Sequence, residues 1–153
     1  MTWEVAGITH TAMLGGWELR VIGSSQHGCR WDVAWVEGGT VVVASGATDP
    51  GVAVEAVRQT AQEALRAWVA REVEQATRRV TGWRRWSGGK AALLWERWRL
   101  EARVGGHWVV YLDGEDDYAA LAHGNCPDPK AQRAALLKAW RTWLREQAVL
   151  LDL

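Results

Sequence analysis

The sequence predicts an α+β protein made of two tandem ββββα units, and three observations support this prediction. Similar patterns occur twice in the same order: "WELRVIG", "WDVAWVEGG" and "TVVVASGATDP" begin at Trp17, and "WRLEARVGG", "HWVVYLDGEDD" and "YAALAHGNCPDP" begin at Trp98. These segments alternate apolar and polar residues with period two, as half-buried strands do. An Ala-rich segment with helical spacing follows each set. The duplication predicts units at 1–78 and 79–153 that form one compact, pseudo-two-fold domain.

In the first unit, alternation and β-branched residues predict strands at 2–14, 17–22, 31–36 and 40–44. The hairpin turn before the last of these is Glu37-Gly38-Gly39. A helix should follow at about 50–77, with Thr48 or Asp49 as its cap and Pro50 in its first turn.

In the second unit, the same reasoning predicts strands at 80–86, 94–104, 108–112 and 118–122 and a helix that begins at Asp128-Pro129. Consecutive strands joined by short turns should pair antiparallel. Each sheet then has one face that requires cover, and the Ala-rich helix after it should provide that cover.

Composition and charge exclude several classes of protein. The chain has 153 residues, 48% of them hydrophobic, and a formal net charge of zero, so no overall field favours nucleic acid or a membrane surface. No apolar stretch approaches the roughly 20 residues that span a bilayer, and the first residues lack a signal-peptide pattern. Two cysteines make no disulfide framework. A soluble, cytoplasmic protein is expected.

Tryptophan and arginine are both over-represented, and the basic residues gather in one part of the chain. There are 12 Trp and no Phe, and only three of the 18 basic residues are Lys. Residues 1–78 carry a net charge of −3 and residues 79–153 a net charge of +3. Within 78–103 there are eight basic and two acidic residues.

The basic tract is interleaved with aromatic residues on neighbouring strands. Trp98, Leu100, Ala102 and Val104 should face one side of their strand, and the intervening charged residues the other. Single-stranded nucleic acid binds to faces where bases stack on aromatic rings and cations follow the backbone. The candidate nucleic-acid-binding residues are Trp83, Arg84, Arg85, Trp86, Lys90, Trp95, Arg97, Arg99, Arg103 and Trp108. The alternative is that these Trp side chains are core residues and the Arg side chains a solvated surface.

Two other clusters contain residue types that bind metals. His27, Cys29, His123 and Cys126 would suit tetrahedral zinc only if the two units brought their ends together. Acidic residues at 113 and 115–117 could hold Mg²⁺, but Asp and Gly are also what hairpin turns use. Scattered ligands and a turn are the simpler interpretation, so no metal and no cofactor are predicted.

Nothing in the sequence indicates catalysis. The four serines lack a nucleophile-elbow motif, and Gly88-Gly89-Lys90 lacks both the first glycine of a P-loop and the Ser or Thr after the Lys. The protein is therefore expected not to be an enzyme.

One short string adds a family resemblance. Gly89-Lys90-Ala91-Ala92-Leu93 is similar to the "GKAAL" signature of the Whirly proteins, and the doubled ββββα plan resembles the fold shared by Whirly proteins and Pur-alpha repeats. In that family two antiparallel sheets backed by helices bind single-stranded DNA or RNA. The resemblance implies that binding would transfer to Lys90 and the neighbouring Trp and Arg residues. The match falls in the second unit, whereas the family's signature opens the first.

The leading hypothesis is a non-enzymatic protein that binds nucleic acid, preferably single-stranded, mainly through its second sheet. The first sheet has Glu18, Arg20 and Ile22 at the matching face and much less positive charge. The alternative is a regulator or inhibitor, from a phage or a bacterium, that binds a protein through Trp and Arg. Exposed sheet edges also make a homodimer a candidate.

Overall fold

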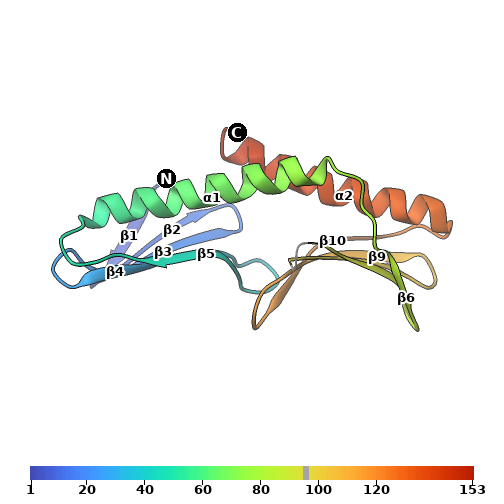
Figure 1. Ribbon diagram of the computed structural model, residues 1–153, viewed down its shortest axis with the longest axis horizontal. Coiled ribbons are helices and arrows are strands. Elements are labelled where there is room, and N and C mark those ends of the chain that lie inside the picture. The colour runs from blue at the N-terminus through green and yellow to red at the C-terminus, as the bar shows by residue number, and fades with distance from the viewer. Residues whose placement is uncertain (95–96) are drawn as a thin grey trace.

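The computed structural model describes residues 1–94 and 97–153 (Figure 1). In this part of the chain, five strands and a helix are followed by five strands and a second helix. The first unit consists of β1 (Trp3–Ala6), β2 (Thr9–Leu14), β3 (Trp17–Ser24), β4 (Gly28–Trp35), β5 (Val41–Ala47) and α1 (Val54–Ala76). The second consists of β6 (Arg84–Trp86), β7 (Gly89–Leu94), β8 (Trp98–Arg103), β9 (His107–Asp113), β10 (Tyr118–Asn125) and α2 (Pro129–Leu150).

The predicted α+β class and the doubled plan are confirmed. Each unit forms an antiparallel meander in which strands adjacent in sequence are adjacent in the sheet. Both helices lie along the same side of the two sheets, and the other sheet faces are left open (Figure 1). Neither helix, over the described residues, is long and apolar enough to cross a membrane.

Each sheet has one strand more than predicted, and in the first sheet the reason is that one predicted strand is a hairpin. The segment 2–14 turns at Gly7, whose φ of 63° is a left-handed value that glycine adopts without strain. Val5 then pairs with His10 across the turn. A single glycine without a second turn residue gave no clear signal of this hairpin.

The second unit also has one strand more than predicted, but for a different reason. The predicted strands at 80–86 and 94–104 are shortened to β6 and β8, and β7 occupies the segment between them, which was not predicted as a strand. Gly89–Leu94 contains no polar alternation that would have marked it as a strand. Val104, predicted on the core face of a longer strand, lies beyond β8 and is 79% exposed because the chain turns at Gly105 and Gly106.

One helix start was predicted correctly and the other was not. Asp128 caps α2 by accepting a hydrogen bond from the Lys130 backbone N–H, with Pro129 in the first turn. α1 begins at Val54 instead of about residue 50, and no side chain caps it. Thr48, a predicted cap, accepts a hydrogen bond from the Cys29 backbone N–H instead.

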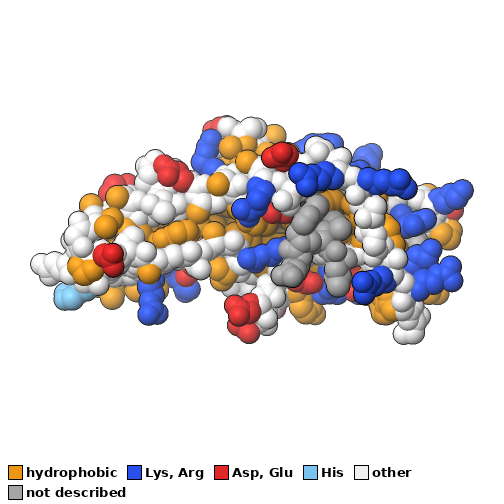
Figure 2. Space-filling view, in the orientation of Figure 1, with side chains coloured by type: hydrophobic (Ala, Val, Ile, Leu, Met, Phe, Trp, Pro, Cys, Tyr) orange, Lys and Arg blue, Asp and Glu red, His pale blue; other side chains and the backbone are white. Residues whose placement is uncertain are grey.

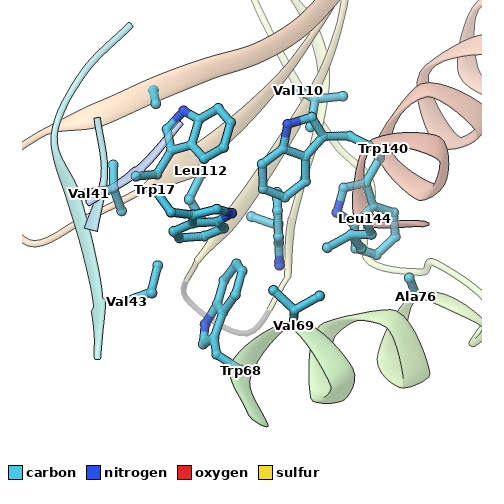
Figure 3. Close-up of a cluster of buried hydrophobic side chains, with 14 of the residues drawn as sticks. Trp17, Val41, Val43, Trp68, Val69, Ala76, Val110, Leu112, Trp140 and Leu144 are labelled. Carbon is cyan, nitrogen blue, oxygen red and sulfur yellow. The ribbon is translucent and has the colours of Figure 1, made fainter. Parts of the chain in front are cut away.

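The core is a continuous cluster of tryptophan rings shared by both units (Figure 3). Trp17 contacts Trp35 and Trp68 edge to face, with ring centroids 5.2 and 5.4 Å apart. Trp98 contacts Trp140 in the same manner at 5.7 Å. Such contacts contribute about 0.5–1.5 kcal/mol each beyond the burial of area. Of the candidate Trp residues, Trp83 and Trp108 pack against this core, whereas Trp86 is exposed.

The C-terminal half of each helix also contacts the sheet of the other unit. Trp68 of α1 lies 6.1 Å from Trp98 of the second sheet, and Trp143 of α2 lies 6.2 Å from Trp17 of the first sheet. The ends of the helices lie side by side (Figure 1), where the Arg66 guanidinium donates to the Leu151 carbonyl. Each unit therefore completes the core of the other.

The sheets also meet on the side away from the helices. The Thr40 backbone N–H donates to Asp117 Oδ2 at 2.8 Å, and the Arg97 guanidinium donates to the Val42 carbonyl at 2.8 Å. The first contact joins the β4–β5 turn to the β9–β10 turn, and the second joins the residue before β8 to β5. They fix the near ends of the two sheets against each other.

Candidate nucleic-acid interface

The predicted binding residues within the described part of the chain lie on β6, β7, β8 and β9 or beside them. Trp95 lies outside the described residues. The others divide into three groups, which are the β6–β7 hairpin, the open face of the second sheet and the side that the helices cover.

The β6–β7 hairpin forms the edge of the second sheet and carries cations on both of its sides. Arg85 pairs with Lys90, and Lys90 pairs with the buried Ala102, so both basic residues lie on the helix side of the sheet. Arg84 pairs with Ala91, which pairs with Glu101, so Arg84 lies on the open side. Since β6 is an edge strand of three residues, both sides of it are accessible.

Of the candidate tryptophans that the structure describes, Trp86 is the exposed one. It is 45% exposed and lies at the tip of the hairpin, packed over Gly88. A Cβ at Gly88 would lie 2.2 Å from the Trp86 ring, so glycine is required there for the ring to take this position. Trp83 and Trp108 are partly buried against the core, which leaves them little free ring surface.

The open face of the second sheet carries an ion-pair network instead of free cations. Arg99 makes two hydrogen bonds of 3.1 Å with Asp113 and also binds Glu101. Arg103 binds Glu101 at 2.9 Å. Burial of Arg99 opposes its charging, but the hydrogen bonds to Asp113 and Glu101 raise its pKa. The pKa of Arg103 is raised chiefly by its hydrogen bond to Glu101. Two positive and two negative groups therefore nearly cancel on this face.

Two tyrosines belong to this network and were not singled out in the sequence. The Arg99 guanidinium lies 4.0 Å from the ring centroid of Tyr111 and 5.5 Å from that of Tyr118. Tyr111 also accepts a hydrogen bond from Arg103 at 2.7 Å. The pairing of Arg99 with Tyr111 across β8 and β9 creates this cluster, and only the register reveals it.

Two grooves flank the hairpin, and Arg85 and Trp86 line both. The first, here called the open-side groove, has a volume of about 530 Å³. It is lined by Gly82, Arg84, Arg85, Trp86, Ala91, Arg99 and Glu101. The second, here called the end groove, has a volume of about 430 Å³ and lies between the hairpin, the β8–β9 turn and the start of α2. Its charged lining residues are Arg85, Lys90, Arg103 and Arg133.

Arg133 is a basic residue that sequence reasoning missed. It lies on α2, 30 residues beyond the end of β8 at Arg103, and no local pattern connects it with the hairpin. Its guanidinium lies 5.9 Å from the ring centroid of Trp83. Figure 2 shows Lys and Arg side chains gathered over the half of the molecule that carries β6 and α2.

Arg97 makes a contact with the first sheet that alternation did not indicate. It precedes β8, and its guanidinium binds the Val42 carbonyl of the first sheet. This contact places it at the junction of the sheets, away from the hairpin.

The two pairs of His and Cys residues do not come together. His27 lies in the β3–β4 turn and Cys126 follows β10, and both of these places are at the ends of the sheets away from the junction at Thr40 and Asp117. The acidic residues at 113–117 form the β9–β10 turn, where Asp113 binds Arg99 and Asp117 binds backbone N–H groups. No group of three or more metal-binding side chains occurs in residues 1–94 and 97–153.

Comparison of the chain with protein-family models, curated proteins and solved structures found no match.

Proposed function

We propose that the protein binds single-stranded nucleic acid, without catalysing a reaction, at the β6–β7 hairpin of the second sheet. The observation that supports this most directly is the exposed Trp86 ring between two grooves lined by Arg84, Arg85, Lys90 and Arg133. A base stacks on an exposed ring with about 1–3 kcal/mol, and cations on either side neutralise the adjoining phosphates. A duplex conceals its base faces and cannot use the ring in this way.

The hairpin suits phosphates better than the open face of the sheet does. On that face Arg99 and Arg103 already bind Glu101 and Asp113, so a phosphate would have to displace a carboxylate. Among the described residues, no acidic side chain forms an ion pair with Arg84, Arg85 or Lys90, and all three lie beside a groove. The hairpin also contains the string "GKAAL", for which the Whirly resemblance implies binding at Lys90.

Fluorescence anisotropy with a labelled 30-nucleotide poly-dT strand tests the proposal. Binding should be tight at low salt, should weaken steeply as salt rises, and should exceed binding to a duplex of the same length. Trp86→Ala should weaken binding about tenfold, since loss of one stacked base corresponds to roughly 1–3 kcal/mol. Met13→Ala is the control, because Met13 is 52% exposed but lies on β2 of the first sheet and lines neither groove.

A second pair of variants tests the role of the cations. Each phosphate contact contributes about 0.7 to the salt slope for a single strand, so R84A/R85A/K90A should lower the slope by about 2. R30A/K138A/R145A removes the same charge from exposed residues elsewhere in the chain and should leave the slope nearly unchanged. Equal effects of the two triple variants would contradict the assignment of the hairpin.

One observation favours a protein partner as a second candidate function. The open face of the first sheet exposes Met13, Ile22 and Val42, whose neighbours include few free cations. Apolar side chains on an open sheet face are suited to a protein surface. If no strand binds at low salt, the regulator hypothesis replaces the nucleic-acid hypothesis.

A further inference from the structure

The end groove concentrates positive charge that no acidic side chain in its lining offsets. Four of its lining residues are basic, and none of the described lining residues is Asp or Glu. Arg103 is neutralised by Glu101 from outside the groove. Arg85, Lys90 and Arg133 remain, and they come from β6, β7 and α2. Three cations around one small volume suit a ligand that carries more than one negative charge at a single point.

The walls of this groove are fixed before any ligand binds. Gln132 of α2 is buried, and its side-chain amide donates to the carbonyls of Arg103 and His107 at 2.8 and 2.9 Å. The Cys126 backbone N–H donates to the Gly106 carbonyl at 2.8 Å. A Cβ at Gly106, which has a φ of 94°, would lie 2.8 Å from the Cys126 carbonyl oxygen, so only glycine allows this close approach.

The partly buried Trp83 gives Arg133 a defined place in the groove. The indole packs against the core, and the Arg133 guanidinium lies above it. A guanidinium held over an aromatic ring keeps its charge and its N–H donors while its rotamers are restricted. A groove of this kind therefore loses little conformational entropy on binding an anion. At the N-terminus of α2, the Lys130 backbone N–H is already bound by the Asp128 side chain.

We propose that the end groove binds a phosphomonoester, and that its source is the terminal phosphate of the strand bound at the hairpin. This inference rests on the proposed function. A phosphomonoester carries about −1.5 to −2 charges at pH 7, whereas a phosphodiester within a strand carries one. The turn at Val104–Gly106 and the two prolines Pro127 and Pro129 line the groove beside the hairpin. A strand that passes Trp86 into the groove ends against these segments.

Anisotropy with four labelled dT strands of equal length tests the proposal. One strand carries a 5′-phosphate, one a 3′-phosphate, one phosphates at both ends and one only hydroxyl ends, with the label attached at an internal base. A strand with a phosphate at one of the two ends should bind about tenfold more tightly than the strand with hydroxyl ends. A hydrogen bond to a charged group changes affinity by about that factor or more. Unlabelled thymidine monophosphate and inorganic phosphate serve as competitors for the groove alone.

Two single variants separate the end groove from strand binding. Arg133→Ala should abolish the preference for the phosphorylated end, so that all four strands bind this variant with equal affinity. Arg84→Ala is the matched control, since Arg84 lines the open-side groove and not the end groove. It should weaken all four strands by the same factor and preserve the preference.

The outcomes distinguish the two proposals. Equal binding of hydroxyl-ended and phosphorylated strands would overturn the phosphate site and leave the proposed function standing. A preference that survives Arg133→Ala would also overturn it. If no strand binds but thymidine monophosphate binds and Arg133→Ala abolishes this, the phosphate site is supported with a free nucleotide as its source, and strand binding is overturned. If neither binds, both proposals fail.

Discussion

The Trp98 indole N–H donates a hydrogen bond of 2.7 Å to the carboxylate of Glu72, and both residues are buried. The bond joins the first residue of β8 to α1, and so joins the two units. Trp17, the first residue of β3, makes the equivalent bond of 3.0 Å to Gln147 of α2. Glu72 lies 18 residues after the start of α1, and Gln147 lies 18 residues after the start of α2. The duplication therefore extends to this exchanged pair of hydrogen bonds.

The equivalence of Glu72 and Gln147 predicts which substitutions are tolerated. Glu72→Gln keeps an acceptor for the Trp98 indole and should change the free energy of unfolding little. Glu72→Leu leaves a buried N–H without its partner and should cost about 1–3 kcal/mol, and Gln147→Leu should cost a similar amount. Urea denaturation measures these differences. Glu74→Leu, at an exposed position of the same helix, is the control, and an equal cost for it would contradict the prediction.

Sequence reasoning was sufficient for features that depend on neighbouring residues. Alternation placed Trp98, Leu100 and Ala102 on the buried side of β8, and all three are buried. The Asp128-Pro129 pair marked the start of α2. Trp17 and Gln147 are 130 residues apart, and no local pattern indicates that a helix of one unit packs against the sheet of the other.

The candidate site was predictable in part for the same reason. Composition identified the basic and aromatic tract, but the pairing of Arg99 and Arg103 with Glu101 depends on side chains that share one face. Arg133 enters the end groove only because α2 returns across the sheet beside the hairpin. Charge counts along the chain cannot separate cations that are free from cations that are paired.

Asp117 should stabilise the junction between the sheets in a pH-dependent way. Hydrogen bonds from the Thr40 and Tyr118 backbone N–H groups lower the pKa of its carboxyl. A carboxyl with a lowered folded-state pKa stabilises the fold above its unfolded value of about 3.9, and this contribution is lost as pH falls through the folded-state pKa. Asp117→Asn should therefore be less stable than the natural protein at pH 7, and the difference should shrink in acid. Asp116→Asn in the same turn is the control. A difference that is independent of pH would contradict the prediction.

His10 should make the first unit less stable as pH falls. Burial, and then the positive charge of Arg58, lower the pKa of His10, and Glu55 opposes this only in part. The Arg58 guanidinium donates to His10 Nδ1, which requires the imidazole to be unprotonated there. Because the folded-state pKa is below the unfolded value of about 6.5, the unfolded chain binds more protons as pH falls through that value.

Denaturation of His10→Gln at several pH values tests this. The natural protein should lose stability relative to the variant as pH falls from about one unit above the unfolded pKa of about 6.5 to about one unit below it. Arg58→Met should recover part of the loss. Parallel stability curves for the natural protein and His10→Gln would rule out the role of His10.

Glu101 should restrain nucleic-acid binding on the open face of the second sheet. It is only 7% exposed and accepts hydrogen bonds from both Arg99 and Arg103, so these cations are not free for phosphates. Glu101→Gln removes the negative charge and keeps an acceptor, which releases part of the positive charge of the two arginines. The variant should bind poly-dT more tightly at low salt than the natural protein does, with a salt slope steeper by about 0.7 for each additional phosphate that it neutralises.

Glu115→Gln makes the same charge change at an exposed position of the β9–β10 turn and should have a much smaller effect. Weaker binding by Glu101→Gln with unchanged stability would show that the intact network is itself part of the binding surface.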